Sequence, residues 1–334
     1  MSFKKLKPDA AEKTLSAEEQ QAKIGEVRKI IGPIADKFSA LCSDASVLRY
    51  LRARNYNSKK AAKMLKGTMK WKLEFKPEKI RWDDVVQEAA RGRLYRADYL
   101  DKQGRTVFVI KPGIQSTNSG TEQIKYLVYC LENAILNQSS NQEQMVWLID
   151  FQGWSTSCLS LKVTRDTAQI LQAHYPERLG RAIFYNPPKV FESFWKMVKP
   201  FLEPKTYKKV TFVYLDNPRS LKIMEELFDM DKLEASFGGK STVGFNYEAY
   251  AKKMREDDRR LSDVIDSGIS SPSLLKSFNE LQHAGDNDSE DETSSDEAVH
   301  SKLEEDYVIK HGKMSCSQYE PKNEVHEPKK CLEN

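Results

Sequence analysis

Few side chains in this sequence have the type and position that covalent chemistry needs. Asp150 follows the apolar run Met145–Ile149, at the expected carboxyl end of a parallel strand, where α/β enzymes place catalytic groups. No partner base accompanies it in the sequence, and its alternative role is to accept a hydrogen bond in the turn at Gly153. An enzyme acting on a phosphorylated small molecule therefore remains an alternative that rests on one carboxylate.

Metal, nucleotide and histidine-based chemistry find little support. Of the histidines, His174 alone lies outside the C-terminal region, and the five cysteines are scattered without the spacing of a zinc site, which favours reduced thiols. Phe237–Ser241 ends like a phosphate-binding loop, but Glu234 stands where the first glycine of such a loop would be. We expect no catalytic residues, no metal and no cofactor.

The stretch Pro187–Thr206 indicates an apolar environment instead. Between its prolines, apolar residues recur at the spacing that draws one continuous face on a helix. Lys189, Lys196 and Lys199 interrupt that face and can extend to water. Such a helix suits a packed core or the boundary of a membrane. Its apolar residues are Val190, Phe191, Phe194, Trp195, Val198, Phe201 and Leu202.

Residues 16–90 are expected to form an all-helical lobe. Ser16 and Glu19 make a capping box at the start of a first helix. A second helical pattern follows Ser43, and Asn57 caps a third that Pro77 ends.

From residue 91 to 245 the pattern alternates between strands and helices. A hairpin-type turn at 101–104 precedes the strand-like run Thr106–Ile110. The alternation predicts an α/β fold with a mainly parallel sheet and crossover helices, followed by a charged helix over residues 246–265. The remaining predicted strands are 145–149, 182–185 and 210–215, and the predicted crossover helices are 121–137, 160–175 and the aromatic stretch.

Charge is divided unevenly along the 334 residues. Residues 266–334 hold 7 lysine and arginine residues against 16 aspartate and glutamate residues, a net charge of −9, whereas residues 1–265 hold 46 against 33, or +13. A basic body implies an anionic partner. The acidic tail lacks a core pattern and is predicted to be disordered. Within it, Ser289, Thr293 and Ser294 each have an acidic residue three positions on, the pattern that acidophilic kinases prefer.

The chain has no apolar run near the roughly 18 residues of a membrane-spanning helix and no secretory signal at its start. We therefore expect a cytoplasmic protein. Nucleic acid is not an expected partner, because the aromatic residues fall on core-facing positions rather than among exposed basic residues.

Four segments together resemble the CRAL-TRIO family, and within it the plant relatives of the yeast secretory phosphatidylinositol/phosphatidylcholine transfer protein. They correspond, in order, to the family's LRFLRAR, YPERxG, KPFLDP and FGG segments, and the resemblance covers roughly residues 20–245. The segments are Leu48–Arg54, Tyr175–Gly180, Lys199–Thr206 and Phe237–Gly239.

This resemblance implies a lipid-binding protein rather than an enzyme. In the family the sheet floors an apolar pocket that holds one phospholipid, and the aromatic helix is its gate. The expected cargo is phosphatidylinositol, exchanged at an anionic membrane surface by a monomer that associates with the membrane peripherally and serves phosphoinositide signalling.

The resemblance also implies a headgroup site at Arg54, Glu177, Thr206 and Lys209. Two cations suit a phosphate, and a carboxylate can accept hydrogen bonds from inositol hydroxyls. The chain departs from the family at Asn55, where the family has a lysine. It departs again at Met145 and Trp147, where hydroxyl residues stand in the family and the wall is here more apolar.

Overall fold

The computed structural model describes residues 15–115, 119–138, 142–158 and 160–265. The acidic tail, with Ser289, Thr293 and Ser294, lies outside these residues. The predicted helical lobe is present, and its helices enclose their own core of Ile24, Val27, Leu51, Leu65 and Met69. Its α-helices are α1 (Ala17–Ile31), α2 (Ile34–Lys37), α3 (Asp44–Ala53) and α4 (Ser58–Phe75).

The helix starts that were predicted from capping residues are confirmed. The Ser16 hydroxyl accepts from the Glu19 N–H at 3.2 Å, while the Glu19 carboxylate accepts from the Ser16 N–H at 2.8 Å. The Asn57 side chain accepts from the Lys60 N–H at 2.9 Å, which satisfies a donor that the first turn of α4 leaves unpaired. The short helices η1 (Pro77–Lys79), η2 (Trp82–Asp84) and α5 (Val86–Ala89) then lead to the sheet.

The sheet has five strands in the order in which they occur along the chain. β2, β3, β4 and β5 are parallel, as the alternating pattern predicted, whereas β1 pairs with β2 in the antiparallel direction. The sequence pattern did not identify β1, because Arg96 and Asp98 give it a polar character. The strands are β1 (Leu94–Leu100), β2 (Thr106–Ile110), β3 (Met145–Asp150), β4 (Leu179–Tyr185) and β5 (Val210–Val213).

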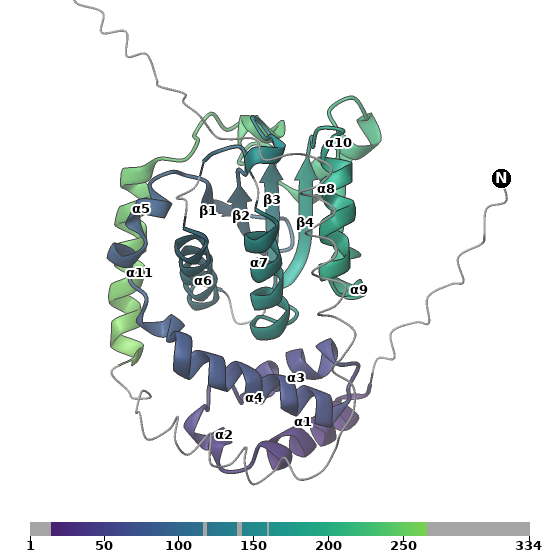
Figure 1. Ribbon diagram of the computed structural model, residues 1–334, viewed down its shortest axis with the longest axis vertical. Helices are drawn as coiled ribbons and strands as arrows, with labels where there is room; N and C mark the ends of the chain where they lie inside the picture. The colour runs from purple at the N-terminus through teal and green to yellow at the C-terminus, as the bar shows by residue number, and fades with distance from the viewer. Residues whose placement is uncertain (1–14, 116–118, 139–141, 159, 266–334) are drawn as a thin grey trace, which may run out of the picture. The chain divides into compact units, whose positions relative to one another are not determined.

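The crossover helices lie on one face of the sheet. A strand order that follows the chain, joined by right-handed crossovers, puts every crossover on the same side. Figure 1 shows α6 (Gly120–Leu136), α7 (Leu161–His174) and α8 (Phe191–Val198) side by side in front of the strands. The connections on this face also contain η3 (Thr156–Cys158), η4 (Lys199–Phe201) and α9 (Pro204–Tyr207).

The opposite face is covered by the chain that follows β5. Tyr185 on β4 packs edge-on against Phe237 with ring centroids 5.3 Å apart, and Tyr99 on β1 packs likewise against Phe228. Phe228 directly follows α10 (Pro218–Leu227), and Phe237 is the last residue of η5 (Ala235–Phe237). The sheet is therefore buried on both faces, which explains the continuous apolar runs of its central strands.

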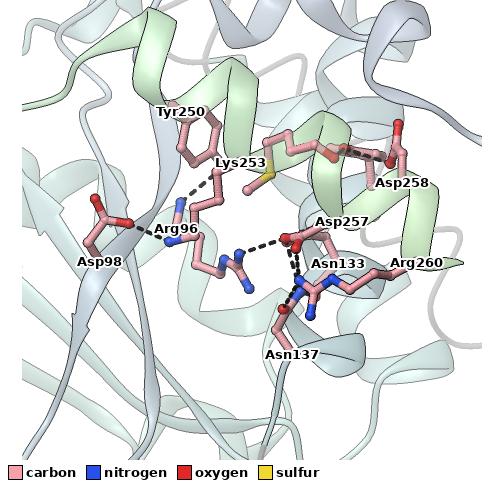
Figure 2. Close-up of polar contacts among 11 residues, drawn as sticks. Arg96, Asp98, Asn133, Asn137, Tyr250, Lys253, Asp257, Asp258 and Arg260 are labelled. Carbon is pink, nitrogen blue, oxygen red and sulfur yellow. Dashed lines mark hydrogen bonds and ion pairs between the residues drawn. The ribbon is translucent and has the colours of Figure 1, made fainter.

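The last described helix, α11 (Tyr247–Ile265), is fixed to the sheet edge by a buried polar network (Figure 2). The Asp257 carboxylate accepts from Arg96 on β1 at 2.7 Å and from Asn133 and Asn137 at 2.9 and 3.0 Å. Asp258 accepts from the backbone N–H of Trp82 at 2.6 Å. The predicted charged helix thus uses its acidic residues to dock.

Candidate functional site

A pocket lies between the sheet, α7 and the segment that joins α8 to β5. Its volume of about 70 Å³ is room for only a few water molecules. One wall is apolar and the rim is polar. The apolar wall is formed mainly by Leu131, Met145, Trp147, Ala168, Leu171, Leu179 and Leu202, and the polar rim by Gln172, Glu177, Arg178, Glu203, Lys205, Thr206 and Lys209.

Three of the four residues expected at the headgroup site lie on this rim. Lys209 Nζ is 3.0 Å from Glu177 Oε2, and both side chains are mostly buried. Thr206 precedes Lys209 by one turn, and its carbonyl accepts from the Lys209 N–H at 3.0 Å. The structure therefore gathers Glu177, Thr206 and Lys209 from two segments of the chain.

Arg54, the fourth, reaches the rim through an ion pair. Its Nη1 is 3.1 Å from Glu203 Oε1, and Glu203 itself lines the pocket. Arg54 follows α3, so this pair links the helical lobe to the end of the α8 segment. Each of the two cations that are expected to bind phosphate is therefore paired with a carboxylate. The site contains two ion pairs rather than two unpaired cations.

The loop that contains Glu177 is fixed by partly buried polar contacts of the neighbouring Arg178. Glu177 has a φ of +59°, in the left-handed region that costs a non-glycine residue energy. Next to it, the Arg178 guanidinium donates to the Gln138 side chain at 3.0 Å and to the Glu143 carbonyl at 3.1 Å. Burial lowers the pKa of Arg178 to about 10, with Arg49 nearby contributing.

The aromatic helix α8 lies directly on the sheet. Phe191, Phe194 and Val198 are buried in one cluster, and Trp195 packs partly buried against it. The ring of Phe191 is 4.4 Å from that of Phe151, and Trp195 is 5.2 Å from Phe184 on β4. Edge-to-face pairs of this kind contribute about 0.5–1.5 kcal/mol each beyond the area they bury.

The ends of the predicted aromatic face differ from the expectation. Val190 precedes α8 and is 53% exposed, so it does not share the buried face. Phe201 lies in η4 and Leu202 follows it, because Pro200 cannot continue the hydrogen-bond ladder of α8. Leu202 nevertheless packs on the same cluster and lines the pocket. Lys189, Lys196 and Lys199 are exposed, as expected of residues that extend to water.

The two features that suggested enzyme chemistry have structural roles. Asp150 is buried, and its carboxylate accepts from the Gln152 N–H at 2.9 Å, one residue before the expected partner Gly153. A Cβ on Gly239 would lie 2.0 Å from the Leu233 carbonyl oxygen, so this glycine permits a close approach of backbone. Within the described residues, no group of histidine, cysteine and acidic side chains could hold a metal, and no helix is long and apolar enough to cross a bilayer.

Comparison with known proteins identifies the class. Residues 91–239 match the CRAL/TRIO domain, and residues 4–67 match the CRAL/TRIO N-terminal domain. The chain belongs to the CRAL-TRIO family, which confirms the resemblance seen in the four motifs.

Among its relatives is the phosphatidylinositol transfer protein PDR17 of Saccharomyces cerevisiae, 30% identical over 244 residues that cover 69% of this chain and 67% of that protein. The SEC14 cytosolic factor of Eremothecium gossypii is 28% identical and is covered over 78% of its length. A CRAL-TRIO domain-containing protein of Schizosaccharomyces pombe is 32% identical over 211 residues, but the chain spans only 20% of that protein. These relatives are fungal, and the likeness to plant members stays a prediction.

The crystal structure of Sfh5 shares the fold. It superposes with a TM-score of 0.57 at 16% identity and covers 76% of this chain and all of the Sfh5 chain. The predicted architecture of a helical region followed by an α/β sheet is therefore confirmed.

Sequence reasoning missed Glu203, Arg178 and Gln172 as parts of the site. Glu203 and Arg178 both lie inside the quoted motifs. Neither motif indicates which side chain will form an ion pair or a hydrogen bond with each of them. The distance of Glu203 from Arg54 along the chain, 149 residues, hides their pairing from any local pattern.

Proposed function

We propose that the protein binds a single phospholipid, with phosphatidylinositol as the preferred cargo, and exchanges it at membrane surfaces without covalent chemistry. One observation carries the proposal. The pocket joins a rim of paired charges, at the positions where the family motifs predict a headgroup site, to an apolar wall next to the aromatic helix. The name of PDR17, a phosphatidylinositol transfer protein, supports the same class.

The rim suits an inositol phosphate. Lys209 and Arg54 can each donate to phosphate oxygens, and Thr206 adds a hydroxyl donor. Glu177 can accept from the ring hydroxyls once Lys209 turns to the phosphate. At Met145 and Trp147, where the family has hydroxyl residues, the wall is apolar. On this departure from the family pattern we favour phosphatidylinositol over phosphatidylcholine.

Acyl chains require α8 to move. Pockets that enclose even drug-sized ligands measure about 300–1,000 Å³, far more than the present volume of about 70 Å³. On this proposal the buried face of α8 lies on the sheet in this closed form, covers acyl chains when lipid is bound, and enters the bilayer during exchange. Burial of each large apolar side chain there contributes about 1.5–3 kcal/mol. Lys189, Lys196 and Lys199 would each add about 1 kcal/mol of attraction to anionic lipid.

The proposal describes a peripheral protein at the cytoplasmic side of membranes that supplies phosphatidylinositol for phosphoinositide signalling. The alternative enzyme has no observation in its favour within the described residues, because the Asp150 carboxylate is used in a turn.

Two measurements test the proposal. Mass spectrometry of the purified protein should find co-purified phospholipid, and a vesicle assay should show phosphatidylinositol transfer. The double variant Glu177→Ala, Lys209→Ala should lose most of that transfer. The matched control is Asp231→Ala, Lys240→Ala, which removes an exposed ion pair of 2.8 Å with the same change in charge and should transfer normally. Equal transfer by both variants would refute the headgroup site, and an empty protein that transfers nothing would refute the function.

A further inference from the structure

Four lysines form a continuous basic row on the exposed side of α4. Spaced four, three and four residues apart, they fall within about 60° of the helix circumference and extend over about 16 Å. Lys59 and Lys63 are exposed, and the other two are half-buried. We call this row, made of Lys59, Lys63, Lys66 and Lys70, the α4 lysine row.

The opposite side of the same helix shows that the row is not a general feature of α4. Ala62, Leu65 and Met69 are fully buried in the lobe core. Lys72, which points toward the sheet domain, pairs with Glu132 at 3.0 Å. For the α4 lysine row, in contrast, the structure records no ion pair with any described residue.

Such a row costs the helix stability. Like charges three and four residues apart repel one another, and the one acidic residue of α4, Glu74, lies beyond the row, one turn after Lys70. Concentrated positive charge on one outer face is complementary to an extended anionic surface rather than to a single small anion.

The surface chemistry distinguishes a membrane from nucleic acid. The row contains neither arginine forks nor aromatic rings, the groups that grip phosphates bidentately and stack on bases. None of the exposed large apolar residues of the described chain belongs to α4. The row can therefore lie against lipid headgroups by charge alone, without insertion into the hydrocarbon.

We propose that the α4 lysine row is a membrane-docking surface for anionic bilayers, separate from α8. The two surfaces should differ in how their membrane binding responds to salt. Attraction through α4 is screened by salt over a Debye length of about 10 Å at 0.1 M, whereas insertion of the α8 aromatic face is apolar and resists salt. The inference does not require that the protein transfers lipid, so the row can dock a protein whose pocket holds some other cargo.

The test uses the full chain and vesicles of phosphatidylcholine with and without about 30 mol % phosphatidylserine, in a sedimentation assay at low and high salt. The first variant changes all four lysines of the row to glutamine. A second variant changes them to arginine, which keeps the charge. A charge-matched control changes four exposed lysines elsewhere to glutamine: Lys102, Lys222, Lys232 and Lys240.

At low salt the glutamine variant of the row should bind anionic vesicles at least about ten-fold more weakly. The arginine variant should bind like the unchanged protein, and the control should lose no more than about two-fold. All differences should vanish at high salt and on pure phosphatidylcholine. Thermal melting should show that the glutamine variant stays folded, since it removes repulsion.

Four results would overturn the proposal. Unchanged vesicle binding by the glutamine variant of the row would show that the row does not dock. An equal loss in the control would show that only net charge matters. A loss of RNA binding with vesicle binding intact would assign the row to nucleic acid. If the variants lose lipid transfer while their vesicle binding is unchanged, the row is not a docking surface. The loss of transfer would then originate in the pocket.

Discussion

Replacement of Glu203 by glutamine should tighten phosphatidylinositol binding if the proposed headgroup site is correct. The Glu203 carboxylate lies 3.1 Å from Arg54 Nη1 and so occupies the cation that a lipid phosphate would use. Glutamine keeps the length of the side chain but removes its charge. The backbone N–H of Glu203, which donates to the Gln172 side chain, is left in place.

The size of the effect follows from the exposure of the pair. The side chains of Arg54 and Glu203 are 26% and 41% exposed, so their ion pair is partly solvated. Pairs of this kind contribute about 0.2–1 kcal/mol. Because a phosphate must displace the carboxylate, its removal should raise affinity by about the same free energy, a factor of about 1.4 to 5 in Kd.

The assay is titration of the protein with vesicles that contain fluorescent phosphatidylinositol, at low and high salt. Arg54→Ala should weaken binding, and the double variant Arg54→Ala, Glu203→Gln should be no tighter than Arg54→Ala alone. Glu226→Gln, which removes one exposed negative charge on α10, is the matched control and should bind like the unchanged protein. Weaker binding by Glu203→Gln, or the same gain in the control, would refute the competition between carboxylate and phosphate.

Further predictions concern α8, α11 and the lobe. Trp195→Asp should reduce association with anionic vesicles, because a carboxylate on the apolar face must be desolvated to enter the bilayer; a fall in stability with vesicle binding unchanged would make α8 an ordinary core helix. Asp257→Ala should lower the free energy of unfolding in urea by about 3–5 kcal/mol, since it leaves the Arg96 charge buried without its partner. Burial lowers the pKa of His174 from 6.5 to about 4, so the unfolded chain binds its proton more readily. Stability should therefore be lost as pH falls from 6.5 toward 4, and His174→Gln should flatten that decline.

Local sequence signals accounted for much of the fold because their physics is local. The capping residue Ser16 acts on backbone groups within its own turn, and the apolar run Met145–Ile149 reports burial on both faces of one strand. β1 was missed because its stabilising partners are distant. Arg96, which makes the strand look polar, is buried against Asp257, 161 residues later.

The candidate site was predictable only as a set of residue types. The family resemblance pointed to Glu177, Thr206 and Lys209, and the structure places all three on one pocket rim. Their role in headgroup binding stays a prediction. The motifs could not foresee that Arg54 and Lys209 would each hold a carboxylate, since ion-pair partners are chosen by the tertiary fold. The pocket volume was equally hidden, because it depends on how closely the rings of α8 approach Phe151 and Phe184.

The contacts of α8 are divided by kind along its length. Beyond its C-terminal end, the Gln172 side chain donates to the Phe201 carbonyl at 2.9 Å and accepts from the Glu203 N–H. Before the helix, Asn186, which directly follows β4, has a φ of +48° and donates from its backbone N–H to the Val213 carbonyl at 2.7 Å. The middle of the helix meets the sheet through aromatic rings.

This division suits a helix that exchanges one apolar environment for another. The first three N–H groups of α8 donate to the carbonyls of residues 188–190, directly before the helix, so these bonds can move with it. Lipid chains can then replace the rings of Phe151, Phe184 and Phe212 as its neighbours. The polar contacts at the ends can persist as hinges while the middle moves. Glu203 belongs to one of these ends and also holds Arg54. A phosphate that takes Arg54 from Glu203 therefore acts on the hinge itself, and we expect headgroup binding and movement of α8 to be coupled through this one carboxylate.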